Sequence, residues 1–178
     1  MSSFKTFNEW RSIKDLGLSS RAIEITYEDA LKDPNFKYPL TLHSLWRLMP
    51  GEIPHFEEIK PSVFGAQVLP SMFIMDVEDG GKDFRWRLFG TDHAQRFGVE
   101  VTGKRMSSVA KVAASAETSL AFARKCYMEK APVFFRTEYY DDQRVKKATH
   151  TAAMPLMGDS GEIERLFGCS VWSTPEKE

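Results

Sequence analysis

The segment FRWRLFGTDHAQRFGVEVTGKRM, from Phe84 to Met106, decides the fold expected for this 178-residue chain. Its first five residues alternate between apolar and charged side chains, which is typical of a strand that has one buried and one polar face. The predicted faces are apolar Phe84, Trp86 and Leu88 on one side and Arg85 and Arg87 on the other.

Strand and helix patterns on either side of this segment predict the rest of the domain. SMFIMDV (71–77) is an apolar run typical of a buried strand, and EDGGKD (78–83) is a tight-turn sequence that makes a hairpin with the segment above. A long helix is expected at 107–130, followed by strands at 133–140, 148–157 and 165–172. This order predicts an α+β domain with a five-stranded antiparallel sheet and helices packed on one face.

Three glycines divide the opening segment, and we interpret them as points where the fold turns. Gly90 follows the strand, Gly98 ends a short helix, and Gly103 lies in a turn. A phosphate-binding loop requires G-x-x-x-x-G-K followed by Ser or Thr, but here Arg105 takes that last position and Glu100 lies inside the loop. The spacing therefore does not favour a nucleotide site.

The first 40 residues differ from the remainder. An amphipathic helix is expected around Trp10, Ile13 and Leu16, which recur at helical spacing before a glycine. A second helix is expected at 42–49, where a Pro-Gly pair stops it. We therefore divide the chain into a partly helical N-terminal extension, residues 1–40, and a domain, residues 41–175.

Composition excludes several classes of protein. The chain carries 24 basic and 25 acidic residues, so its net charge does not indicate a nucleic-acid or anionic-membrane partner. No apolar run approaches the roughly 20 residues of a membrane span, and the N-terminus lacks the pattern of a secretory signal. Cys126 and Cys169 lack ligand-like spacing and suit buried, reduced thiols. A cytoplasmic location is expected.

No set of residues in the sequence indicates catalysis or metal binding. The four histidines, at positions 43, 55, 93 and 150, are not spaced as zinc ligands with each other or with the cysteines. GDSG (158–161) resembles the nucleophile segment of trypsin-like proteases, but it separates two short strands and uses residues typical of tight turns. We therefore expect neither an enzyme nor a metal site.

Several short motifs, in this order, resemble the bacterial PAS_5 family of PAS domains over roughly residues 42–172. An LP pair precedes the first strand, an aromatic-Arg-aliphatic strand enters GT, a G-x-x-x-T-G follows, and PL and G occupy the last two strands. These motifs are Leu69-Pro70, the stretch Trp86 to Thr91, Gly98 to Gly103, Pro155-Leu156 and Gly168.

The resemblance implies a stand-alone sensory or regulatory module that signals to a separate, unidentified partner protein. It does not name a cofactor. Haem-binding relatives usually draw their axial histidine from the long helix, which has none here, so His93 is the remaining candidate. Flavin-adduct relatives carry a cysteine before the long helix, and residues 93–98 contain none.

The long helix is rich in alanine, and short side chains facing a sheet can leave room for a small apolar or amphipathic ligand. The alternative is that aromatic side chains fill this space. The predicted pocket residues are Trp86, Leu88, His93, Ala116, Leu120, Phe135 and Met154.

The surface residues expected to contact a partner or a second copy in a homodimer are Trp10, Ile13, Leu16, Arg85 and Arg87. For the two arginines, a solvated strand face is the simpler interpretation. An alternative function is a ligand-free dimerisation or scaffold module with a fully packed interior.

Overall fold

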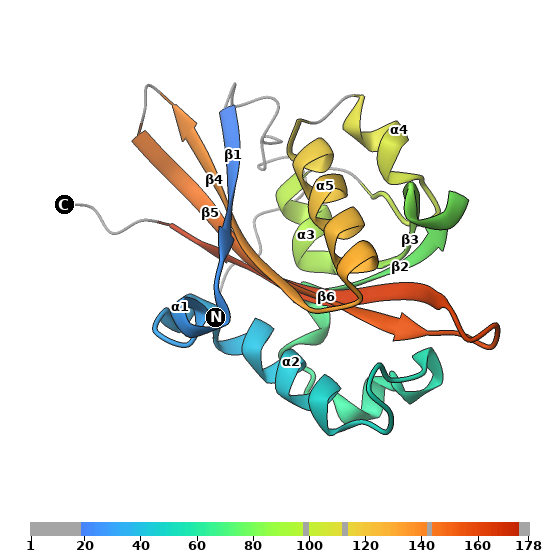
Figure 1. Ribbon diagram of the computed structural model, residues 1–178. Helices are drawn as coiled ribbons and strands as arrows, with labels where there is room; N and C mark the ends of the chain where they lie inside the picture. Colours follow the sequence, from blue (N-terminus) through green and yellow to red (C-terminus); the bar gives the residue numbers. More distant parts are fainter. Residues whose placement is uncertain (1–18, 98–99, 112–113, 142–143, 175–178) are drawn as a thin grey trace.

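Six antiparallel strands form one sheet in the computed structural model, which describes residues 19–97, 100–111, 114–141 and 144–174. Their order across the sheet is β1-β4-β5-β6-β2-β3 (Figure 1). The strands are β1 (Ser19–Ile25), β2 (Met72–Glu78), β3 (Asp83–Phe89), β4 (Val133–Asp141), β5 (Arg144–Met157) and β6 (Ile163–Ser173). The α-helices are α1 (Tyr27–Ala30), α2 (Lys37–Leu48), α3 (Thr91–Phe97), α4 (Met106–Ala110) and α5 (Ala114–Glu129).

Helices cover both faces of the sheet. Figure 1 shows α3, α4 and α5 on one side, which we call the inner face, and α1 and α2 on the other, the outer face. On the inner face the ring of Phe135 stacks on Phe122 of α5, with centroids 4.2 Å apart. On the outer face the indole Nε1 of Trp46 in α2 donates a hydrogen bond to the carbonyl of Pro155 at 2.8 Å. The α+β class is confirmed, but the expectation of helices on one face is wrong.

The sixth strand, β1, comes from the segment expected to be a partly helical extension. All seven of its residues pair with β4, from Ser19 opposite Tyr140 to Ile25 opposite Phe134. The turn after α1 then buries Phe36 in the outer layer. Residues 19–40 are thus packed on the sheet, whereas Trp10, Ile13 and Leu16 lie outside the described residues.

A β-bulge at Arg87 changes the direction of the side chains at the end of β3. Met75 is opposite Trp86 and Ile74 is opposite Leu88, so Arg87 is an extra residue on its strand. Beyond the bulge Phe89, rather than Leu88, packs in the inner layer, and Leu88 is 40% exposed. The predicted shared face holds for Phe84 and Trp86 but not for Leu88.

The expected long helix is divided between α4 and α5. The buried face of α5 repeats at helical spacing and consists of small or medium side chains. Its members are Ala116, Leu120, Ala123 and Cys126.

Gly90 occupies a position that no side chain can share. A Cβ atom there would lie 2.1 Å from the carbonyl oxygen of Pro70 and 2.8 Å from that of Met72. The amide of Gly90 donates to the same Met72 oxygen at 2.9 Å, which ties the start of α3 to the start of β2. Gly103 is needed for a different reason, because its φ of +82° lies in the left-handed region that favours glycine. Gly98 lies outside the described residues.

We predict that Gly90→Ala lowers the free energy of unfolding by about 1–3 kcal/mol, because the neighbouring atoms are backbone and must shift. The matched control is Gly65→Ala, where an added Cβ meets nothing within 4 Å. Urea unfolding followed by circular dichroism measures both variants. Equal stabilities would show that the close approach at Gly90 does not constrain the fold.

Candidate functional site

The inner layer brings together three of the predicted pocket residues. Trp86 of β3, Leu120 of α5 and Phe135 of β4 belong to one cluster of buried side chains between sheet and helices. Ala116 is also buried on α5, with 9% of its surface exposed, although it lies outside that cluster. Sequence positions far apart therefore share this layer, and it is the candidate ligand site.

His93 is buried, whereas two predicted pocket residues face elsewhere. The Nε2 atom of His93 lies 2.8 Å from the carbonyl oxygen of Ser71, so this nitrogen carries the proton and donates. Its ring contacts Phe89 with centroids 5.2 Å apart. Leu88 is on the outer side of the bulge, and Met154 packs in the outer cluster because it follows Ala153, which faces inward.

Trp86 carries a polar group that the described residues do not satisfy. The residue is 9% exposed, and its Nε1 atom is buried without a hydrogen-bond partner in the described part of the chain. Phe73 and Phe89 hold the ring edge-to-face, with centroid distances of 6.0 and 4.9 Å. A buried donor without a partner is uncommon and marks a position where an acceptor can be gained.

Residues 100–107, which we call the strap, run along the free edge of β3 beside the same tryptophan. The amide of Trp86 donates to the carbonyl of Lys104 at 3.1 Å, and its carbonyl accepts from Gly103 at 2.7 Å. Val101 and Met106 of the strap are buried in the inner cluster. The backbone of Trp86 thus holds the strap while its side chain lies in the candidate ligand site.

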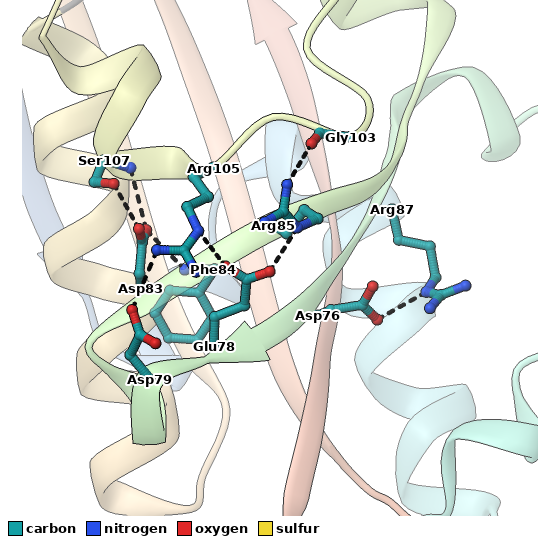
Figure 2. Close-up of polar contacts among 10 residues, drawn as sticks. All are labelled: Asp76, Glu78, Asp79, Asp83, Phe84, Arg85, Arg87, Gly103, Arg105 and Ser107. Atoms are coloured by element: carbon teal, nitrogen blue, oxygen red, sulfur yellow. Dashed lines mark hydrogen bonds and ion pairs between the residues drawn. The ribbon is translucent and has the colours of Figure 1, made fainter.

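Four charged residues, which we call the clamp, hold the strap from the outside (Figure 2). They are Glu78, Asp79, Arg85 and Arg105. The carboxylate of Glu78 lies 2.5 Å from Nε of Arg85 and 2.6 Å from Nε of Arg105. Arg85 also donates to the carbonyl of Gly103 at 2.8 Å, and Arg105 lies 3.3 Å from Asp79. One glutamate therefore joins an arginine of β3 to an arginine of the strap.

A second acidic residue extends this pairing across the sheet. Asp76 lies 2.7 Å from Nε of Arg87 and 3.2 Å from Nε of Arg165, whose guanidinium covers the ring of Phe56 at 3.8 Å. Arg85 and Arg87 are thus half-exposed but paired within the domain. Any partner that binds them must compete with Glu78 and Asp76.

Asp83 fixes the start of α4. Its Oδ1 accepts from the amides of Phe84 (2.8 Å) and Ser107 (3.1 Å), and its Oδ2 accepts from the Ser107 hydroxyl at 2.5 Å. Burial opposes ionisation, but these hydrogen bonds and the charge of Arg105 together hold the pKa of Asp83 below its usual value. The carboxylate thereby satisfies the amide of Ser107 in the first turn of α4, where helix amides lack partners within the helix.

A polar cluster around the buried residues Glu138 and His150 lies on the outer face, away from the candidate ligand site. Glu138 lies 2.8 Å from both Arg21 and Arg136. On the neighbouring strand, His150 lies 2.9 Å from the Ser173 hydroxyl. These contacts join β1 to β4 and β5 to β6 on the side covered by the N-terminal residues.

The remaining sequence predictions concern cysteines, metals and membranes. Burial raises the pKa of both thiols, that of Cys169 to about 12, so both stay protonated. Among the described residues, no three His, Cys, Asp or Glu side chains are arranged to hold a metal ion. In the same residues, no helix is both long and apolar enough to cross a membrane.

Comparison with known proteins identifies the family. The model of the PAS_5 family, described as a PAS domain, matches residues 40–171. The chain belongs to the PAS_5 family. This membership confirms the resemblance seen in the sequence and supports a sensory or regulatory role for this PAS domain.

Two further comparisons give different results. Among solved structures, the PAS domain from Bordetella pertussis BvgS is similar, with a TM-score of 0.46 and 20% identity. That similarity covers 62% of this chain and 81% of the BvgS chain. A search of curated proteins finds no match.

Sequence reasoning missed the strap and the unsatisfied indole. Arg105 and Glu78 are 27 positions apart, and neither charge nor spacing predicts that they meet. The state of the Trp86 nitrogen depends on every neighbour around the ring, so alternation alone predicted only its burial. The acidic residues of EDGGKD were a usable signal for arginine partners, since Glu78 and Asp79 both pair with Arg105.

We predict that Asp83→Ala lowers the free energy of unfolding by about 1–3 kcal/mol, because the Ser107 amide loses its acceptor. Asp29→Ala is the control, since Asp29 pairs with Lys32 at the surface and such pairs contribute about 0–1 kcal/mol. Chemical denaturation of both variants tests this. Similar losses in the two would show that Asp83 does not anchor α4.

We also predict that the domain loses stability in mild acid. Burial lowers the pKa of His43 and His150, with Arg47 adding to the effect at His43, whereas Asp33 and Glu138 partly oppose it at His150. The unfolded chain, where histidine has a pKa of about 6.5, therefore binds more protons than the folded protein below that pH. The free energy of unfolding should fall as pH drops from 6.5 through the folded pKa values.

The measurement is urea unfolding at pH 7.5 and at pH 5.5. The double variant His43→Gln/His150→Gln removes both groups and should show a smaller difference between the two pH values than the natural protein. An unchanged difference would assign the acid sensitivity to other groups.

Proposed function

We propose that this PAS domain is a sensory or regulatory module that binds a small apolar or amphipathic molecule between the inner face of the sheet and α5. The observation that carries the proposal is the buried, unpartnered indole nitrogen of Trp86 in this layer. A ligand that enters there gains a hydrogen bond that the described residues leave unmade.

The buried face of α5 supports the same site. Ala116 and Ala123 present short side chains toward the inner layer, and the aromatic rings of Trp86 and Phe135 line the sheet opposite. The ring of Phe122 already stacks on Phe135, so ligand entry requires a rearrangement in this layer. Such a rearrangement is how occupancy would become a conformational signal.

The strap is the proposed route by which this signal reaches a partner protein. It is bonded to the backbone of Trp86 and clamped by Arg85, and both Arg85 and Arg87 are half-exposed at the same edge of the sheet. We propose these arginines as partner contacts that become available when the pairing with Glu78 or Asp76 changes. The outer face is a weaker candidate, because α2 packs on it.

Native mass spectrometry of the full chain, repeated after denaturation, tests ligand binding. A mass released on denaturation supports the sensor, and a bare dimer with no adduct supports the scaffold function instead.

We predict that Ala116→Leu abolishes or strongly reduces binding of the released molecule, because the larger side chain fills buried space on α5. The control is Ala121→Leu on the exposed side of the same helix, which should bind as the natural protein does. Titration of each variant with the released molecule gives the affinities, and Ala116→Val replaces Ala116→Leu if the latter unfolds. Unchanged affinity in the Ala116 variants would remove this site from consideration.

A further inference from the structure

We infer that the ligand is an uncharged molecule carrying a hydrogen-bond acceptor, such as a carbonyl or ether oxygen, and that the indole N–H of Trp86 recognises it. The inference rests on the proposed ligand site and adds to it the chemical class of the ligand and the group that selects it. Three observations support it: the geometry of the ring, the charges around it and its connection to the strap.

The ring of Trp86 is held so that its nitrogen cannot reach solvent. Edge-to-face contacts with Phe73 and Phe89 fix the ring, and the Nε1 atom is buried. An indole nitrogen is a donor only, so its complement must be an acceptor. Trp46 provides the contrast, because its Nε1 is also buried but donates to the carbonyl of Pro155 at 2.8 Å. The donor of Trp86, unlike that of Trp46, has no hydrogen-bond partner among the described residues.

The surroundings of the ring favour an uncharged ligand. Apolar side chains such as Met75 and Leu120 are buried around Trp86, and the nearby buried His93 uses its Nε2 on the carbonyl of Ser71. The charged side chains of this region lie outside the apolar cluster and already have partners. Glu78 binds two arginines, and Asp83 accepts from Ser107. An ion in this layer would lose its hydration without gaining a counter-ion, which is strongly unfavourable.

The position of Trp86 also links recognition to the strap. The residue that offers its indole N–H to the ligand uses its own amide and carbonyl to hold Lys104 and Gly103. A ligand that accepts a hydrogen bond from the indole therefore contacts the same residue whose backbone holds the strap. The contact that selects the ligand is therefore also the one through which ligand binding would alter the strap.

Three matched probes test the ligand class on the full chain. Acetophenone carries an acceptor oxygen, ethylbenzene has a similar size without one, and benzoate carries a charge. The chain has four tryptophans, so a ¹H–¹⁵N spectrum contains four indole signals, and Trp86→Phe identifies the one from Trp86. We expect acetophenone to shift that signal and to bind more tightly than either of the other two probes.

Two substitutions assign the contact. Trp86→Phe keeps an aromatic ring but removes the donor, and it should weaken acetophenone binding about threefold to tenfold, as expected for loss of one neutral hydrogen bond. Trp46→Phe removes an indole on the opposite face of the sheet and should leave the affinity unchanged. Thermal unfolding of both variants without probe verifies that they fold.

The outcomes separate this inference from the proposed function. If ethylbenzene or benzoate binds as tightly as acetophenone, or if Trp86→Phe retains full affinity, the ligand site stands and the acceptor-recognition role of Trp86 is wrong. If none of the probes binds and native mass spectra show no released mass, the proposed function fails and this inference fails with it.

Discussion

Burial of the central strands on both faces is the constraint on which the structure depends. In β5, Ala153 faces the inner layer and Met154 the outer one, and in β6 Leu166 and Phe167 divide in the same way. Strands of this kind are stable only when both faces are covered, because either exposed face would leave large apolar side chains in water. The N-terminal residues provide the second cover, which explains why α2 packs where an open face was expected.

The edge strand β3 shows how a local irregularity shapes the candidate site. The bulge at Arg87 turns Phe89 inward beside Trp86 and turns Leu88 outward. The free edge of the strand is then partly covered by the strap, which satisfies the backbone groups of Trp86. Because the clamp that reinforces it is partly exposed, its ion pairs are weak individually and can exchange partners without unfolding the core.

The two layers differ in what they can do. In the outer layer Glu138 pairs with two arginines, and His150 lies beside Asp33 of the N-terminal residues, so this layer joins elements of the fold. The inner layer combines rigid aromatic rings, small side chains on α5 and the unsatisfied indole donor of Trp86. That combination is typical of ligand sites, where apolar contacts supply affinity and a few polar groups supply orientation.

The sequence by itself determined the fold class, the family and most strands, because alternation, turn residues and apolar runs are local properties of the chain. It correctly predicted that Trp86, Leu120 and Phe135 are buried and that GDSG is a turn between two strands. Tertiary structure alone decided that residues 19–25 complete the sheet, that Leu88 and Met154 leave the inner layer, and that Arg105 meets Glu78. These outcomes depend on strand register and on contacts between distant segments, which side-chain periodicity does not encode.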